Sequence, residues 1–244
     1  MKNLIFIVIS LFVANVMAKP LFLITSFDAF NGHQNNNSQK IAELILKKME
    51  SSFTIIHCQL PTSFQKSLKT FEDCYQSLPE KPAMVLSLGE TGCNLKIEHR
   101  AINKIKVTGP DNDGYFPRGE IMSWGEKFLG MTYPLEDMFC SLSSLEKSKI
   151  ILSKDAGTFV CNDLSYKILT HYPELSFGFI HVPSANCSNI DLLNDQSVNI
   201  LSKLLLFWDL NRSNTRSLPI SKDQLTPNWR QDVCKNEYYK RIRL

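Results

Sequence analysis

The feature of this sequence that most limits its fold is an alternation between short apolar runs and amphipathic stretches. Five runs are predicted as strands: 21–25, 53–60, 84–88, 150–152 and 177–182. Five stretches are predicted as helices: 38–49 with Ser38 as its cap, 64–77, 135–145, 162–171 and 190–208. Strands that alternate with helices indicate an α/β fold whose layers enclose a largely parallel sheet.

The two ends of the chain differ from this body. Lys2 and the apolar run 4–16, followed by Val16-Met17-Ala18, are typical of a cleaved signal peptide, predicted here as residues 1–18. An uncleaved membrane tether is the alternative, although the run is short for a permanent span. No later segment reaches transmembrane length, so no membrane span is expected after cleavage. Residues 19–206 are predicted to form one domain, and 207–244 a basic C-terminal extension.

Charge argues against one class of partner. Residues 207–244 hold eight Lys or Arg and four Asp or Glu, whereas 19–206 hold 18 basic and 20 acidic residues. A nearly neutral body with a basic tail is not typical of a nucleic-acid-binding protein. Such a tail is usually solvated, with weak attraction to an anionic surface as the other option.

Seven cysteines fit an exported protein with one thiol left over. An oxidising compartment favours disulfides, and six cysteines can pair in any of 15 ways. The leftover thiol is then a candidate reactive group. The alternative is that several of the cysteines are simply small buried apolar residues.

One cysteine stands where a nucleophile is expected. In Asp155-Ala-Gly-Thr-Phe-Val-Cys-Asn162 a strand ends, a turn containing glycine follows, and Cys161 opens a helix. The amide groups and the dipole at a helix N-terminus stabilise a thiolate and can donate to an oxyanion. Taken by itself, Cys161 is also compatible with a buried structural role.

Two further residues complete a possible triad. His181 closes the apolar strand in Phe179-Ile-His-Val-Pro183 and so lies at the carboxyl edge of the sheet, where α/β sites gather. Glu98 stands between apolar positions, and a buried carboxylate requires a partner such as an imidazole. Nucleophile, base and orienting carboxylate would then be Cys161, His181 and Glu98. Viewed separately, His181 would be interpreted as a core histidine and Glu98 as a surface residue that forms a salt bridge.

The turn 109–114 carries a weak calcium-loop pattern. Asp111, Asp113, Gly114 and Glu120 stand at suggestive spacings. The first ligand position, however, would be Gly109, which has no side-chain oxygen. The pattern therefore favours a plain turn, and no metal site is predicted.

Taken in order, several segments resemble one family. They are Phe27-Asp-Ala-Phe30, Glu98 to Asn103, Pro110-Asp-Asn112, Ala156 to Asn162, and Phe179 to Pro183. Across about residues 20–205 the chain resembles pyroglutamyl peptidase I, a cysteine peptidase that removes N-terminal pyroglutamate from peptides. The segments around Cys161 and His181 are highly specific, and the first segment is looser.

The resemblance implies a fold, a triad and a pocket. It implies a single three-layer α/β/α domain with a central mixed sheet, a triad of Cys161, His181 and Glu98, and no metal or cofactor. Family members often assemble as tetramers, which implies a homo-oligomer. Phe27 and Phe30 would flank the lactam ring, although core packing explains them too. An apolar slot suits a neutral lactam and excludes free glutamate, whose charge is costly to desolvate.

The chain also departs from the family pattern. Ser26-Phe-Asp-Ala-Phe-Asn-Gly32 stands where the family has Gly-Phe-Glu-Pro-Phe-Gly-Gly, and the lost glycines and proline reshape the rim of the pocket. Glu90 replaces a glutamine common in bacterial members, and the loop after it is about two residues shorter. Thr108 replaces a common arginine. The signal peptide and the tail lie outside the family pattern, since typical members are cytosolic.

Three hypotheses follow. The first is an exported omega peptidase, periplasmic or secreted, that acts on peptides with an N-terminal pyroglutamate. The second keeps the chemistry and changes the substrate to another N-blocked group. The third is an exported, non-catalytic binding protein in which Cys161 is oxidised or tied into a disulfide.

Overall fold

A computed structural model describes residues 19–211 and Cys234. The predicted signal peptide at 1–18 and nearly all of the predicted extension lie outside the described residues. Within the described part, no helix is long and apolar enough to cross a membrane.

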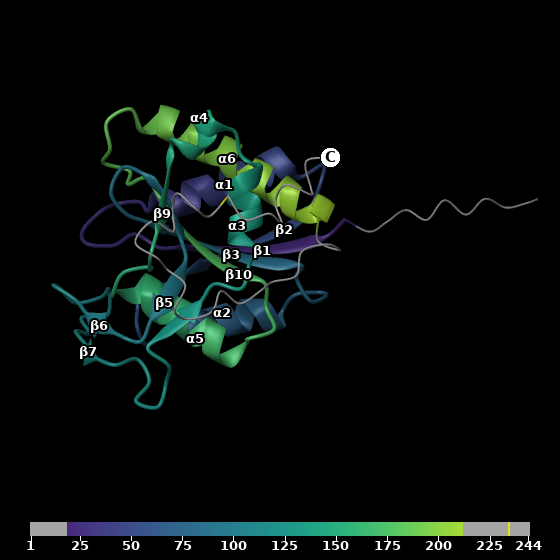
Figure 1. The fold of residues 1–244 in the computed structure, drawn as a ribbon. Coiled ribbons are helices and arrows are strands. Elements are labelled where there is room, and N and C mark those ends of the chain that lie inside the picture. Colours follow the sequence, from purple (N-terminus) through teal and green to yellow (C-terminus); the bar gives the residue numbers. More distant parts are fainter. Residues whose placement is uncertain (1–18, 212–233, 235–244) are drawn as a thin grey trace, which may run out of the picture.

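A six-stranded sheet forms the centre of the molecule (Figure 1). Its order is β2 (Thr54–Leu60), β1 (Leu21–Phe27), β3 (Met84–Glu90), β10 (Phe177–Val182), β4 (Leu95–Glu98) and β9 (Ile150–Ser153). Every neighbouring pair is parallel except β10 and β4. The expected mixed, largely parallel sheet is thereby confirmed.

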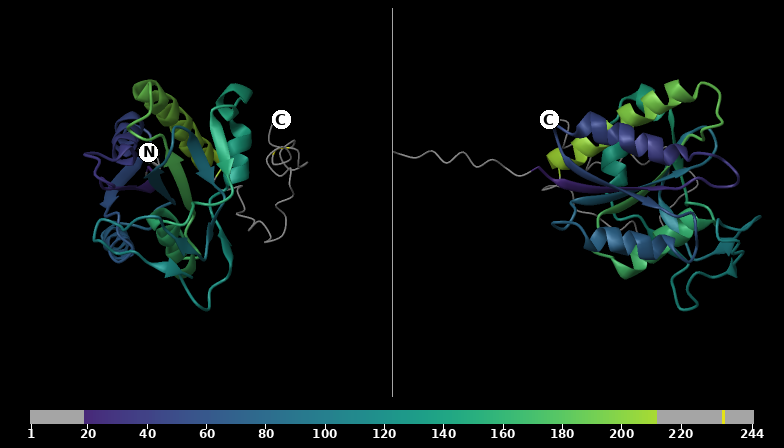
Figure 2. Two further views of the ribbon diagram at one scale, coloured as in Figure 1. Left: turned by 90° about the vertical axis from the view of Figure 1, so that its left-hand side faces the viewer. Right: turned by 180° about the vertical axis from the view of Figure 1, so that it is seen from behind.

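Helices cover both faces of the sheet, as Figure 2 shows from two further sides. One face is covered by α1 (Asn37–Met49), α3 (Leu135–Ser141), α4 (Ser144–Lys147) and α6 (Ile190–Asn211). The other face is covered by α2 (Ser67–Gln76) and α5 (Val160–His171). Consecutive strand residues point to opposite faces, so each strand contributes to two cores. In β10, Ile180 packs with the α1 side, and Phe177 and Phe179 pack with the α5 side.

Two small antiparallel pairs extend the domain next to α5. They pair β5 (Arg100–Ile102) with β8 (Phe128–Gly130), and β6 (Ile105–Lys106) with β7 (Arg118–Gly119). These strands, and β4, were absent from the sequence prediction. They are only two to four residues long, too short for an alternating pattern to stand out.

The helix bounds correct three predictions. Asn36, and not Ser38, caps α1: its side chain accepts the Ser38 N–H, while the Ser38 hydroxyl accepts the Phe27 N–H at 3.1 Å. The predicted helix 135–145 is two helices, because Ser143 and Glu146 form a capping box that starts α4. The helix α6 continues to Asn211, past the predicted helix end at residue 208.

Candidate active site

The predicted nucleophile lies at the start of α5, on the side of the sheet that this helix covers. Gly157 has φ +84°, a left-handed conformation suited to glycine, and turns the chain from β9 into α5. Cys161 is the second residue of α5 and is partly exposed. Cys161 therefore lies at the positive end of the α5 dipole, which favours a negatively charged group there.

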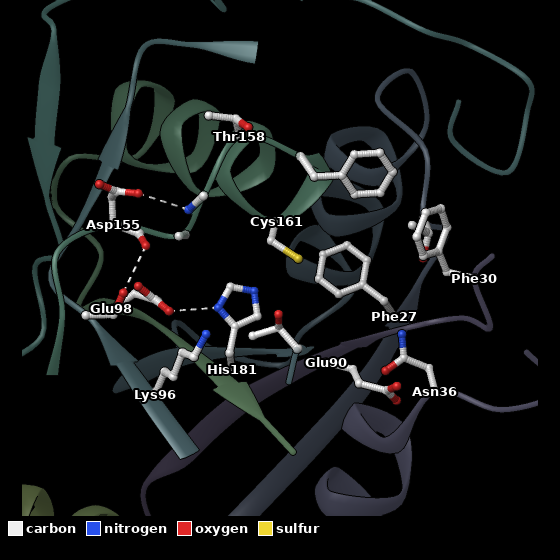
Figure 3. A pocket seen from close by; sticks show the side chains of 16 residues that line it. Phe27, Phe30, Asn36, Glu90, Lys96, Glu98, Asp155, Thr158, Cys161 and His181 are labelled. Atoms are coloured by element: carbon white, nitrogen blue, oxygen red, sulfur yellow. Dashed lines mark hydrogen bonds and ion pairs between the residues drawn. The ribbon is translucent and has the colours of Figure 1, made fainter. Parts of the chain in front are cut away.

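The structure brings the three predicted triad residues together (Figure 3). His181 Nδ1 lies 2.8 Å from Glu98 Oε1, and Cys161 lies close enough to the imidazole to raise its pKa. His181 and Glu98 are 7% and 1% exposed, so water competes little for this pair. Cysteine, imidazole and carboxylate therefore lie next to one another in that order at the carboxyl edge of β10.

The protonation of His181 follows from these neighbours. Burial alone lowers the pKa of an imidazole because it disfavours the charged form. Hydrogen bonds and charge–charge attraction from Cys161 and Glu98 outweigh burial here, and they raise the pKa of His181 from 6.5 to about 9. A histidine with this pKa holds a proton at neutral pH and can deliver it to a leaving group.

Glu98 reaches His181 from an unexpected direction. Because β4 runs antiparallel to β10, Lys96 lies opposite His181, and Glu98 lies two residues further from the edge. The two β4 side chains point to the same face as the imidazole. The sequence pattern identified the carboxylate but not the reversed strand that carries it.

A cavity of about 370 Å³ opens in front of Cys161. Its lining includes all five predicted site residues, since Phe27 and Phe30 lie there with the triad (Figure 3). Phe159, which the prediction did not include, packs against Phe30 with ring centroids 4.8 Å apart. Three aromatic rings thus form one side of the cavity, which we call the aromatic wall (Phe27, Phe30 and Phe159).

The loop that carries Phe30 is held by side chains from distant segments. Asp28 Oδ1 accepts the Thr62 N–H at 2.7 Å, and the Asn112 amide donates to the Ala29 carbonyl at 2.7 Å. The motif Pro110-Asp-Asn112 therefore positions the aromatic wall. Asp111, the middle residue of this motif, accepts the Phe64, Asp113 and Tyr115 N–H groups, as in the predicted plain turn.

Gly89 is a site residue that the prediction missed. A Cβ atom at this position would lie 3.0 Å from Cys161 Sγ and 2.9 Å from the Phe179 ring. Real Cβ atoms hardly ever approach this closely, so only glycine leaves room for the sulfur. The signal in the sequence was a glycine near the end of a buried strand, which indicates close approach of another group.

Glu90 and Thr108, which depart from the family pattern, lie in different places. Glu90 lines the cavity, accepts the Ser184 hydroxyl at 2.6 Å and also accepts the Asn37 N–H. Its carboxylate thus joins the start of α1 to the segment after β10. Thr108 is exposed and is not part of the cavity lining.

The cysteines divide into three disulfides and one thiol within the described residues. Cys58 pairs with Cys74, Cys93 with Cys187, and Cys140 with Cys234. Cys161 is the free cysteine. The pair Cys93–Cys187 joins the segments after β3 and β10.

Comparisons with known proteins identify a family. A family model described as pyroglutamyl peptidase matches residues 21–202. The pyrrolidone-carboxylate peptidase of Bacillus velezensis is 33% identical over 170 residues, which cover 66% of this chain and 77% of that protein. The pyrrolidone-carboxylate peptidase of Clostridium perfringens is 30% identical over 187 residues, 73% of this chain and 85% of that protein.

Solved structures show the same fold. The crystal structure of pyroglutamyl peptidase I from Bacillus amyloliquefaciens superposes with a TM-score of 0.64 at 27% identity, and it covers 76% of this chain and 95% of that one. The pyrrolidone carboxyl peptidase from Thermococcus litoralis gives a TM-score of 0.67 at 23% identity, with 82% and 99% covered. The second likeness supports the fold alone.

Proposed function

This chain belongs to the pyroglutamyl peptidase family, and we propose that it removes N-terminal pyroglutamate from peptides through Cys161, His181 and Glu98. One observation carries the proposal. A free thiol lies beside a buried imidazole, and that imidazole is hydrogen-bonded to a buried carboxylate, at the edge of an aromatic cavity. Membership of a family of hydrolases argues against the non-catalytic binding protein.

The proposed first step is attack by the Cys161 thiolate on the carbonyl carbon of the pyroglutamyl residue. A carbon–sulfur bond forms, and negative charge moves to the carbonyl oxygen, where the amide groups at the start of α5 stabilise it. The protonated His181 then gives its proton to the nitrogen of the scissile bond. The carbon–nitrogen bond breaks, the shortened peptide leaves with a neutral amine, and a thioester remains.

The proposed second step returns the enzyme to its starting state. His181, now neutral, takes a proton from a water molecule as that water attacks the thioester carbonyl. The carbon–sulfur bond breaks, pyroglutamic acid leaves, and Cys161 and His181 are again thiolate and imidazolium. Glu98 holds the imidazole orientation throughout, because its Oε1 atom stays bonded to Nδ1 and leaves Nε2 toward the sulfur.

The aromatic wall supports the choice of substrate. A five-membered lactam is flat, small and uncharged, and it gains from contact with aromatic rings. A free N-terminal glutamate would bring a carboxylate and an ammonium group into the same slot, and both are costly to desolvate. Because the loop Ser26–Gly32 departs from the family pattern, peptides with another N-blocked group are the main alternative substrates.

The experiment is hydrolysis of a pyroglutamyl fluorogenic amide by the mature chain. We expect turnover by the wild-type protein and none above background by Cys161→Ala. Serine at both Cys58 and Cys74 is the matched control, because it removes cysteines far from the cavity and should leave turnover in place. Turnover by Cys161→Ala, or cleavage of only acetylated or formylated amides by the wild type, would contradict the proposal.

We also propose that the protein is exported. The apolar run 4–16 supports export, and so does a structure in which every described cysteine except Cys161 is paired. Alkylation without reduction, followed by mass spectrometry of protein from the native source, tests this. We expect an N-terminus at Lys19 and alkylation of Cys161 alone; a retained Met1 with seven alkylated cysteines would refute it.

A further inference from the structure

Lys96 is a cation in the cavity that the proposed reaction does not use. It lines the cavity beside the triad and is partly buried. It stands opposite His181 in the pairing of β4 with β10, level with the imidazole at the edge of the sheet. Figure 3 shows its side chain running alongside the Glu98–His181 pair toward the imidazole.

The ammonium group of Lys96 has no hydrogen-bond or ion-pair partner within the part of the chain that the structure describes. Glu98 is bonded to His181, and Asp155 accepts the Gly157 N–H on the far side of Glu98. Partial burial of an ammonium without a partner is unfavourable, because it loses water without gaining a counter-charge. A ligand carboxylate next to the Lys96 ammonium would supply the missing counter-charge.

The chemistry of the reaction determines which part of a substrate passes Lys96. The aromatic wall lies on one side of the Cys161 sulfur, and His181 with Lys96 lies on the other (Figure 3). His181 must reach the nitrogen of the departing amine, so the departing peptide runs on the histidine side. The residue directly after the scissile bond therefore lies next to Lys96.

We propose that Lys96 is a specificity residue that favours substrates with a carboxylate on the amino acid directly after pyroglutamate. This rests on the proposed function. The carboxylate has two sources with one chemistry: an acidic side chain in a longer peptide, or the C-terminal carboxylate of a pyroglutamyl dipeptide. A lysine suits both, because its ammonium is a point charge on a flexible stem.

The test compares kcat/KM within two matched pairs of substrates. One pair is pyroglutamyl-glutamyl amide and pyroglutamyl-glutaminyl amide, which differ by a side-chain charge. The other is pyroglutamyl-alanine and pyroglutamyl-alanine amide, which differ by a terminal charge. We expect the wild type to prefer the charged member of at least one pair by about fivefold, as for a partly buried charge pair. The pair that shows the preference identifies the source.

Variants at Lys96 test whether this lysine causes the preference for the charged substrate. Lys96→Gln should bring the ratio within that pair close to unity, Lys96→Arg should retain it, and added salt should weaken it. Lys47→Gln, which removes an exposed lysine of α1, is the control and should keep the wild-type ratio.

Three results would overturn the proposal. The first is a wild-type ratio near unity in both pairs. The second is a ratio that survives in Lys96→Gln. The third is an equal loss of kcat by Lys96→Gln on all four substrates, with a shifted pH profile. That result would show that Lys96 acts on His181 and not on the substrate. Failure of the wild type to cleave any of the four would instead overturn the proposed function, and this inference with it.

Discussion

The side of the cavity that carries Cys161, His181 and Glu98 is built from the ends of regular elements, whereas two of the three rings of the aromatic wall, Phe30 and Phe159, lie outside them. The three groups proposed to react stand on the helix α5 and on the strands β10 and β4 of the sheet, against a buried core. Phe30 stands in the segment between β1 and α1, which is held by bonds from Asn36, Thr62 and Asn112.

The contrast indicates which kinetic property depends on each side of the cavity. Bond making and proton transfer depend on short distances, and regular elements fix side chains more closely than loops do. A slot for a small ring tolerates more variation, and loops can change without disturbing a core. Changes on the triad side should therefore lower kcat strongly, and changes on the aromatic side should act mainly on KM.

The largest effect is expected from Glu98→Gln. The amide preserves shape but removes the charge that orients His181, so kcat should fall by about a thousandfold with little change in KM. Glu80→Gln, at an exposed turn, is the charge-matched control. A comparable rise in KM, with kcat near the wild-type value, would contradict the division between the two sides.

Gly89→Ala should give the next largest loss. The added methyl group would meet Cys161 Sγ and the Phe179 ring at about 3 Å, and so displace the proposed nucleophile. A shift of this kind can cost about a hundredfold in kcat, and the crowding about 1–3 kcal/mol of stability. Steady-state kinetics and thermal unfolding measure the two. Gly109→Ala is the control, since its Cβ would meet nothing within 4 Å; equal behaviour of the two variants would refute the close contact.

The pH profile should report the charged pair on the triad side. The pKa of His181 is raised to about 9, so its proton is present at neutral pH and is lost as pH rises through that value. We expect kcat to fall by about tenfold per pH unit above about 9. Glu98 contributes to the raised pKa, so Glu98→Gln should move this limb to lower pH. An unmoved limb in that variant would show that another group titrates there.

Phe30→Ala should have the smallest effect and should act on binding. It removes a ring from the aromatic wall and its contact with Phe159, so KM should rise by about tenfold with a smaller change in kcat. Phe116→Ala, an exposed ring outside the cavity lining, serves as the matched control. A thousandfold loss of kcat in Phe30→Ala would remove the distinction between the two sides.

The sequence predicted the long elements well because burial imposes a clear period on them. The β10 strand was placed to the residue, and the larger helices were found with errors at their ends. The segment 95–130 was missed as a set of strands, since β4 to β8 are only two to four residues long. Their pairing is decided by contacts with α5 and β10, which no local pattern records.

The site was predictable where chemistry demands a residue type and not where geometry alone decides. Cys161, His181 and Glu98 carry reactive groups in a recognisable context, and the structure brings them together. Gly89 matters because it has no side chain, and Asn112 matters because its amide donates to a distant backbone carbonyl. Lys96 became visible only when the reversed direction of β4 placed it beside His181.

The most direct test of the account is titration of the native mature protein with iodoacetamide, with activity on a pyroglutamyl amide followed in parallel. We predict that one equivalent is incorporated, that peptide mapping locates it at Cys161, and that activity disappears in proportion. Full activity after Cys161 is alkylated, or loss of activity with the label on another cysteine, would contradict the claim that this thiol is the nucleophile.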